Sequence, residues 1–117
     1  MKTILHVDDS ETMRQMIRMC LGAKYKVMFA NNGQEACEVF EKEKIDLIIT
    51  DINMPVMNGI ELIKNIRLTN KEICIMTLTT ESDDDIRTKG YNAGANGWIC
   101  KPFKPTTLVE IVNKIFE

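Results

Sequence analysis

Residues 45–59 have the sequence IDLIITDINMPVMNG, in which an apolar run ends at a single carboxylate, Asp51. The run is rich in β-favouring residues that do not alternate with polar ones, which is typical of a strand buried on both faces. Two turn-forming pairs, MP and NG, then interrupt the chain before a helical pattern begins at Ile60. We therefore expect Asp51 at the carboxyl end of a central parallel strand, where open α/β folds place their functional groups. Considered in isolation, a turn or helix-capping aspartate is the simpler interpretation of Asp51.

Length and charge restrict the class of protein. A chain of 117 residues can bury one hydrophobic core but not two, so we expect a single domain over residues 1–117. The net charge is −2 and no run of Lys or Arg occurs, which gives no reason to expect nucleic acid or a membrane as a partner. No internal repeat or low-complexity linker interrupts the sequence.

The cysteines and the N-terminal residues indicate a reducing compartment. The four cysteines fall in apolar stretches without a CxxC motif, and the chain has one His, so we expect reduced core thiols rather than a zinc site. The chain starts without a charged segment and long apolar segment of the secretory type, and no run of about 18 apolar residues occurs. We therefore expect a cytoplasmic protein. The cysteines are Cys20, Cys37, Cys74 and Cys100.

The rest of the chain repeats the order of a strand followed by a helix. Further strands are predicted at residues 4–7, 26–30, 73–78 and 98–100, and apolar residues recur at helical spacing after them. Five such units imply a parallel sheet with helices on both faces, because crossover connections are right-handed. The clearest helical stripes are Met13, Met16, Ile17, Cys20 and Leu21; Ala36, Val39 and Phe40; Ile60, Ile63 and Ile66; and Leu108, Ile111, Val112, Ile115 and Phe116.

The fourth helix has a weak sequence signal. Ser82 and the aspartates that follow it are predicted to cap this helix and to complement its dipole. We do not expect these aspartates to bind a metal, since successive helical residues diverge by about 100°. Gly90, Asn92 and Gly94 are poor helix formers, so we expect the helix over residues 83–92 to be mobile.

Charged and hydroxyl side chains follow the predicted strands. Asp8 and Asp9 follow the first strand, Asp51 the third, Thr79 the fourth and Lys101 the fifth. Because the carboxyl ends of parallel strands meet at one edge of the sheet, these side chains should lie close together. Three adjacent carboxylates repel one another and raise their pKa values, so a divalent cation or the Lys101 ammonium should neutralise them. Hard oxygen ligands suit Mg²⁺, and an aspartate can accept a phosphoryl group.

At these residues the chain resembles the receiver domains of two-component response regulators, and specifically the single-domain, CheY-like chemotaxis regulators. The resemblance rests on VDDS at residues 7–10, D-x-N-M-P-x-M-N-G at residues 51–59, Thr79, and KPF at residues 101–103. The segment DDSETMR at residues 8–14 is especially similar to the chemotaxis regulators. The resemblance covers the whole chain and implies a doubly wound, flavodoxin-like sheet with strand order 2-1-3-4-5.

The resemblance also implies how the charged residues act. Asp51 would accept a phosphoryl group from the phosphohistidine of a partner kinase. Mg²⁺ would be held by Asp9, Asp51 and the Asn53 carbonyl, with Asp8 acting mostly through water. Lys101 would pair with one phosphoryl oxygen, so that positioning and charge neutralisation drive the transfer.

Three further features follow from the resemblance. Thr79 would donate its hydroxyl to a phosphoryl oxygen, and the peptide bond between Lys101 and Pro102 would be cis. Trp98 occupies the position of the switch aromatic, which is more often Tyr or Phe in the family. The fourth helix, fifth strand and fifth helix would form the surface that binds a target.

The partners expected on this basis are a sensor histidine kinase of the CheA-like type, a target such as the flagellar motor switch, and a phosphatase. The domain would catalyse its own phosphorylation and dephosphorylation and no other reaction. An intermediate of a phosphorelay, which passes the phosphoryl group to another histidine, is an open alternative.

Two other classes of protein fit the sequence less well. A flavodoxin-like binder of small molecules is disfavoured because no Gly-rich loop follows the first strand, where Asp8 and Asp9 would repel a phosphate without a cation. A protein–protein module that has lost phosphorylation would have little reason to retain the acids, the hydroxyl and the lysine together.

Overall fold

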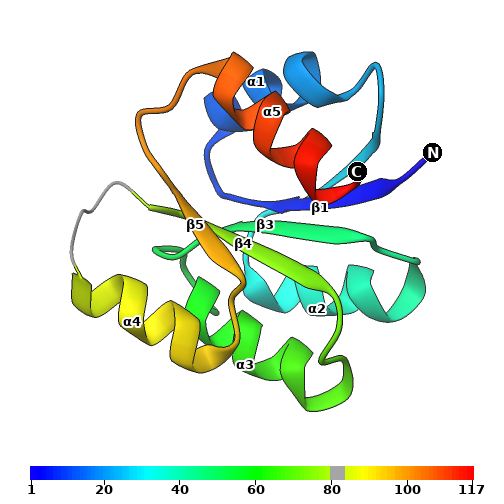
Figure 1. The fold of residues 1–117 in the computed structure, drawn as a ribbon. Coiled ribbons are helices and arrows are strands. Elements are labelled where there is room, and N and C mark those ends of the chain that lie inside the picture. Colours follow the sequence, from blue (N-terminus) through cyan, green and yellow to red (C-terminus); the bar gives the residue numbers. More distant parts are fainter. Residues whose placement is uncertain (80–83) are drawn as a thin grey trace.

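Five parallel strands form the central sheet of the computed structural model, which describes residues 1–79 and 84–117, in the order β2-β1-β3-β4-β5 (Figure 1). The doubly wound topology and strand order predicted from the sequence are confirmed. The strands are β1 (Thr3–Val7), β2 (Lys26–Ala30), β3 (Leu47–Asp51), β4 (Cys74–Thr79) and β5 (Gly97–Cys100). The helices are α1 (Glu11–Leu21), α2 (Gly33–Lys42), α3 (Gly59–Thr69), α4 (Asp84–Ala93) and α5 (Pro105–Ile115).

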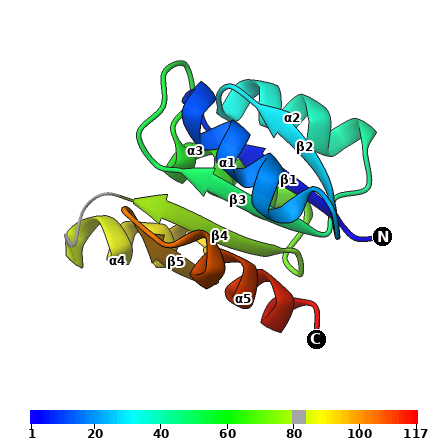
Figure 2. The ribbon, with the colours of Figure 1, turned by 90° about the horizontal axis from the view of Figure 1, so that it is seen from above.

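Helices cover both faces of the sheet. Helices α1 and α5 lie on one face, and α2, α3 and α4 lie on the other (Figures 1 and 2). The apolar core is divided in the same way, because Ile48 of β3 packs in the cluster on the α2–α4 side while Leu47 and Ile49 pack in the cluster on the α1 and α5 side. The central strand is therefore buried on both faces, as its sequence predicts.

Strand register brings the carboxyl ends of the strands together. Val7 of β1 is aligned with Thr50 of β3, so Asp8 follows at the level of Asp51. At the other side of the sheet, Thr79 of β4 is aligned with Cys100 of β5, the residue before Lys101. The register thus places the predicted functional residues at one edge.

The central strand begins two residues later than its apolar run. Ile45 is buried, but the strand starts at Leu47 because Asp46 is engaged with the start of β1. The Asp46 carboxylate accepts the Thr3 N–H at 2.8 Å, and the Asp46 N–H donates to the Thr3 carbonyl at 2.8 Å. The predicted cap at Ser82, together with Thr80 and Asp83, lies outside the described residues.

The thiols are free, but one of them is not in the core. Cys20, Cys37 and Cys74 are partly buried, whereas Cys100 is exposed, so the expectation of a core thiol is wrong for Cys100. Cys100 ends the edge strand β5 and is contacted there by Arg87 of α4, whose Nη2 lies 3.1 Å from Sγ. Among the helices that the structure describes, none is long and apolar enough to span a membrane.

Candidate functional site

Three carboxylates converge at the carboxyl edge of the sheet. One oxygen from each of Asp8, Asp9 and Asp51 lies within 4.8 Å of the others. Asp8 is buried, Asp51 is partly buried and Asp9 is exposed, so the cluster extends from the interior to the surface. The strand ends therefore assemble the acidic cluster that the sequence predicts.

Backbone and side-chain donors fix Asp8. Its Oδ1 accepts the Ser10 N–H at 2.9 Å, and its carbonyl accepts two hydrogen bonds from the Arg14 guanidinium at 3.2 and 3.1 Å. The core-facing stripe predicted for this helix does not include Arg14, which indicates a side chain directed to solvent. Instead, Arg14 turns back over the loop between β1 and α1 and holds the backbone from which Asp8 projects.

Asp51 and Lys101 form the second part of the cluster. Asp51 Oδ1 accepts the N–H of Ile52 at 2.8 Å, while Oδ2 lies 3.3 Å from Lys101 Nζ. The same ammonium lies 3.7 Å from Asp8 Oδ2. Lys101 thus offsets part of the negative charge of both carboxylates, as the sequence predicts.

Burial dominates the electrostatics of Asp8. Desolvation raises the pKa of its carboxyl, and the neighbouring carboxylates of Asp51 and Asp9 act in the same direction. The Ser10 N–H and the Lys101 ammonium oppose this rise in pKa because they favour the ionised form. A cation at this position would favour the ionised form further.

Thr79 and Lys101 are joined through the backbone. Thr79 is buried at the end of β4, and its carbonyl accepts the Lys101 N–H at 2.7 Å. The peptide bond between Lys101 and Pro102 is cis, as the resemblance to receiver domains implies. These two strand ends therefore place Thr79 next to Lys101, whose ammonium contacts the acidic cluster.

Asn53 and Trp98, which also have predicted roles, lie outside the acidic cluster. The Asn53 side chain is exposed in the connection from β3 to α3, and the ligand role of its carbonyl stays a prediction. Trp98 is partly buried on β5, where its ring meets Tyr91 edge-on at 5.2 Å and Arg87 Cζ lies 4.5 Å from its centroid. The indole thus packs against α4, and its switch role also stays a prediction.

His6 was not identified as part of the site from the sequence. It is fully buried on β1, with Nε2 3.7 Å from Asp8 Oδ2, a distance too long for a hydrogen bond. Burial lowers the pKa of His6 to about 3, and the positive charges of Lys101 and Arg14 add to this effect. The contact is therefore not an ion pair at neutral pH. Strand alternation places His6 and Asp8 on the same face, which is the signal that could have identified it.

The donor set at this edge fits a hard divalent cation. Three carboxylate oxygens within 4.8 Å of one another can share one ion, and oxygen ligands of this kind suit Mg²⁺. One Lys ammonium at 3.3 and 3.7 Å from two of the carboxylates does not balance three negative charges. The cluster therefore has both the ligand chemistry and the net charge of a cation site.

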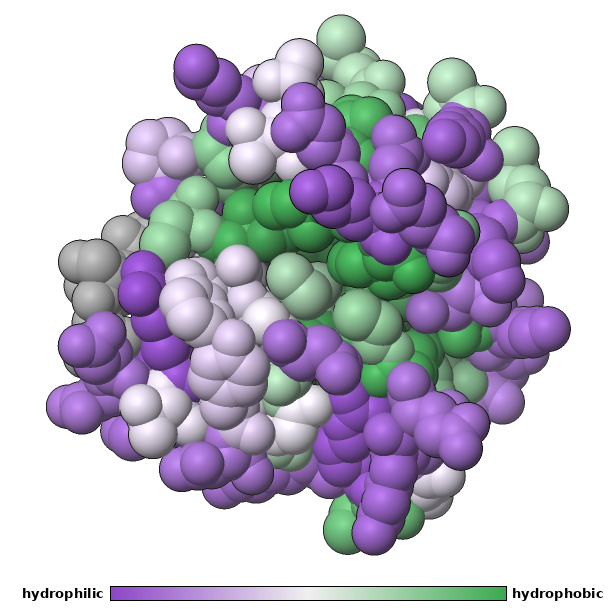
Figure 3. Space-filling model, viewed as in Figure 1, coloured by the Kyte–Doolittle hydropathy of each residue, from purple (hydrophilic) through white to green (hydrophobic). Residues whose placement is uncertain are grey.

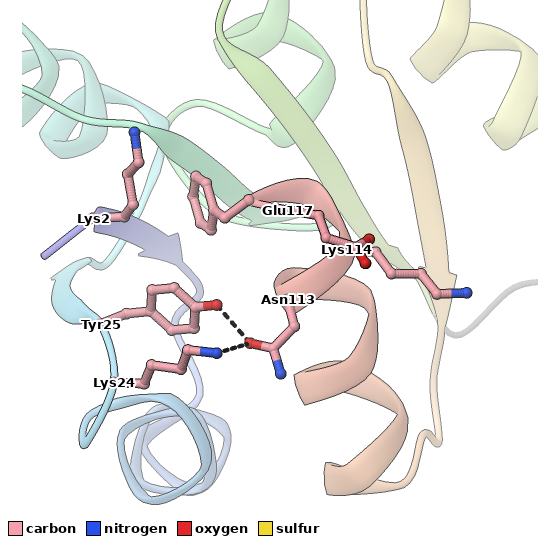
Figure 4. A pocket seen from close by; sticks show the side chains of 7 residues that line it. Lys2, Lys24, Tyr25, Asn113, Lys114 and Glu117 are labelled. Atoms are coloured by element: carbon pink, nitrogen blue, oxygen red, sulfur yellow. Dashed lines mark hydrogen bonds between the residues drawn. The ribbon is translucent and has the colours of Figure 1, made fainter.

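A surface hollow of about 480 Å³ lies at the opposite, amino end of the sheet (Figure 4). Lys24 Nζ and Tyr25 Oη both donate to Asn113 Oδ1 there, which ties the start of β2 to α5. This hollow is separate from the acidic cluster because the strands run the length of the sheet between them. Its lining residues are Lys2, Lys24, Tyr25, Asn113, Lys114, Phe116 and Glu117.

Comparison with known proteins agrees with the geometry of the acidic edge. Residues 4–113 match the response regulator receiver domain family. The chain is 38% identical to the chemotaxis protein CheY-3 of Vibrio cholerae, over 97% of this chain and 91% of that protein. It is 41% identical to CheY1 of Helicobacter pylori, over 92% and 90% of the two chains. The solved structure of the chemotaxis response regulator CheY4 of Vibrio cholerae superposes with a TM-score of 0.92 at 41% identity, covering 98% of each chain. The chain belongs to the receiver domain family of two-component response regulators.

Proposed function

We propose that this protein is a phosphorylation-driven switch in which Asp51 accepts a phosphoryl group from the phosphohistidine of a sensor kinase. The observation that carries this proposal is the position of Asp51, which lies beside the other two carboxylates and in contact with the Lys101 ammonium. Transfer breaks the bond between phosphorus and the kinase imidazole nitrogen and forms a bond from phosphorus to an Asp51 carboxylate oxygen. The imidazole keeps the electron pair and takes up a proton. Hydrolysis then returns the free carboxylate, so the domain acts only on its own phosphorylation state.

The residues around Asp51 prepare it for this transfer. The Ile52 N–H holds one carboxylate oxygen, which fixes the orientation of the other. Asp8, Asp9, Asp51 and the Asn53 carbonyl would hold Mg²⁺, which would neutralise charge on the carboxylates and on the incoming phosphate. Lys101 would move its ammonium from Asp51 to a phosphoryl oxygen. Positioning and charge neutralisation therefore account for the chemistry of this site.

The output surface is proposed to consist of α4, β5 and α5. Figure 3 looks onto this side of the molecule and shows hydrophobic surface between α5 and the strands, bordered by hydrophilic side chains. Ile111 and Ile115 of α5 are among the partly buried apolar residues of these elements. A surface of mixed apolar and polar character is suited to reversible binding of another protein.

Chemotaxis is the pathway that the comparisons support, since proteins 33 to 41% identical to this chain are named CheY. A CheA-like kinase would then be the phosphoryl donor, and the flagellar motor switch would be the target. A phosphatase would be a further partner.

Phosphorylation with a small-molecule phosphodonor tests the proposal directly. We expect acetyl phosphate to label Asp51 when Mg²⁺ is present, and we expect no label in EDTA or in Asp51→Asn. Asp46→Asn is a matched control, because Asp46 immediately precedes the opposite end of β3 and its substitution should not alter labelling. Mass spectrometry that located the label on another residue, or equal labelling in EDTA, would contradict the proposal.

A further inference from the structure

His6 is the buried polar group that the proposed chemistry leaves without a role. Its side chain is completely inaccessible, and within residues 1–79 and 84–117 neither ring nitrogen has a hydrogen-bond partner. Asp8 Oδ2 is also buried and has no hydrogen-bond partner in the same part of the chain. These two groups face each other, with 3.7 Å between His6 Nε2 and Asp8 Oδ2.

Neighbouring side chains fix the plane of the imidazole. The Phe29 ring meets it edge-on, with centroids 5.8 Å apart and an interplanar angle of 87°. Arg18 in turn lies over Phe29, with Cζ 4.9 Å from the ring centroid. The imidazole is therefore held between β2 and the acidic edge, with Nε2 on the side of Asp8.

The chemistry of the two groups determines which nitrogen carries the proton. In a neutral imidazole, one nitrogen donates and the other accepts. An unprotonated Nε2 would direct its lone pair at a carboxylate oxygen, which is repulsive, whereas an Nε2–H would complement it. The tautomer protonated on Nε2 is therefore favoured in this pocket.

We propose that His6 is a positioning residue for the metal site, whose Nε2–H closes onto Asp8 Oδ2 when the site binds a divalent cation. This inference rests on the proposed function of the acidic cluster. Asp8 Oδ1 is already held by the Ser10 N–H, whereas the Lys101 ammonium lies 3.7 Å from Oδ2 and is closer to Asp51. A donor at Oδ2 then holds the carboxylate in a fixed orientation, as partners of metal ligands generally do.

Nitrogen-15 NMR of the imidazole tests the tautomer and the hydrogen bond without reference to activity. His6 is the one histidine of the chain, so its signals need no assignment by mutation. We expect the Nε2–H tautomer in EDTA, and a downfield shift of the Nε2 proton when Mg²⁺ is added. The Nδ1–H tautomer, or an Nε2 proton that does not respond to saturating Mg²⁺, would overturn the inference.

Variants of His6 separate positioning from packing. We expect His6→Leu, which removes the donor, to weaken Mg²⁺ binding about 10-fold, the lower limit for loss of a partner of a metal ligand. His6→Gln can place an amide N–H near the position of Nε2 and should restore affinity to within about twofold. Ile4→Val is the packing control, because Ile4 is buried on the same face of β1 two residues earlier.

The three variants and Asp9→Asn give distinguishable outcomes in an NMR titration with Mg²⁺. Loss of affinity in His6→Leu but not in Ile4→Val, with recovery in His6→Gln, supports the inference. Equal loss in His6→Leu and His6→Gln, or parent affinity in His6→Leu, overturns it while leaving the metal site intact. If Asp9→Asn binds Mg²⁺ as tightly as the parent protein, the proposed metal site itself is contradicted.

Discussion

At the scale of single residues, Lys101 determines the charge balance of the acidic edge. Its ammonium lies 3.3 Å from Asp51 Oδ2 and 3.7 Å from Asp8 Oδ2, so one cation is shared between two anions. Because Asp51 is partly exposed, solvent screens its ion pair with Lys101. Lys101 therefore contributes modestly to stability, and its main contribution is expected when a phosphoryl group adds further negative charge.

We expect Lys101→Ala to lower the free energy of unfolding in EDTA by about 1 kcal/mol, the scale of a partly exposed ion pair. Mg²⁺ binding should persist, since the carboxylates remain. Beryllofluoride, a phosphoryl mimic, should no longer shift the amide NMR signals of α4, β5 and α5, because the contact from the ammonium to the mimic is missing. Lys104→Ala serves as the control, because Lys104 is exposed beyond the cis peptide bond. Parent-like shifts in Lys101→Ala would contradict the proposed role.

The members of the acidic cluster could be predicted because each is adjacent to the end of a strand. Asp8, Asp51 and Lys101 meet at the predicted edge, since the carboxyl ends of parallel strands are brought together by register. His6 and Arg14 could not be placed in the same way. An imidazole in an apolar strand has no visible partner in the sequence, and a long guanidinium can turn back from its predicted direction.

At the scale of elements, the connection from β3 to α3 depends on close approach of two backbone segments. Gly59 begins α3, and its N–H donates to the Ile52 carbonyl at 2.9 Å. A Cβ added at Gly59 would overlap the Asp51 carbonyl oxygen and would lie 2.9 Å from Ile52 Cα. Neither backbone atom can move without moving Asp51, the proposed phosphoacceptor. Gly59 is thus required for the position of Asp51.

Gly90 in α4 provides a matched comparison. A Cβ added there would lie 4.0 Å from its nearest neighbours, Ile60 Cδ1 and Thr77 Cγ2, which is ordinary van der Waals contact. We expect Gly90→Ala to raise the free energy of unfolding by about 0.5–1 kcal/mol through helix propensity. Gly59→Ala should lower it by about 2 kcal/mol or more and should slow labelling of Asp51. Urea denaturation of both variants checks this, and equal effects of the two substitutions would contradict the steric argument.

The succession of elements was predictable from apolar periodicity, but some boundaries were not. The strand β3 starts at Leu47 because the Asp46 carboxylate is committed to the Thr3 N–H, a contact across 43 positions of sequence. Cys100 was expected in the core because its neighbours are apolar, yet it ends an edge strand. Both differences arise from long-range packing, which local patterns do not contain.

At the scale of the whole molecule, the buried His6 couples folding to pH. The pKa of His6 is 6.5 when the imidazole is fully solvated and about 3 in the folded protein, so the unfolded chain binds more protons between these values. Stability from this group is therefore complete above pH 6.5 and is lost as the pH falls towards 3. Asp8 acts in the opposite direction, because its raised pKa makes protonation easier in the folded state. The effects of His6 and Asp8 on the pH dependence of stability therefore partly cancel, so each must be measured separately.

We expect His6 alone to reduce the free energy of unfolding by about 2 kcal/mol between pH 7 and pH 5 in EDTA. Denaturation of the parent protein and of His6→Leu at both pH values isolates this contribution, since the other titrating groups are common to both. Between the same pH values, the free energy of unfolding of His6→Leu should fall by about 2 kcal/mol less than that of the parent protein. The same pH dependence in both proteins would show that His6 is not buried in its neutral form.

Signal transmission requires that phosphorylation at one edge changes a surface some distance away. Thr79 ends β4 beside the acidic cluster, and Trp98 lies on the adjacent strand. In this structure the Trp98 ring is held by Tyr91 at 5.2 Å and by Arg87, whose Cζ is 4.5 Å from the indole centroid. If Trp98 acts as a switch by turning its indole inward, both contacts with α4 must break. A phosphoryl group can favour that state only through contacts that differ between the two states, such as a hydrogen bond from the Thr79 hydroxyl.

Trp98 is the one tryptophan of the chain, so its fluorescence reports this rotation without ambiguity. We expect beryllofluoride to change Trp98 emission and to reduce its quenching by acrylamide about twofold or more, only in the presence of Mg²⁺, because rotation buries the indole. Thr79→Ala should suppress both changes, whereas Thr69→Ala, a substitution at the exposed end of α3, should not. If emission and quenching stay constant while beryllofluoride still increases binding of a target, Trp98 is a fixed contact residue. The coupling must then run through α4 without rotation of Trp98.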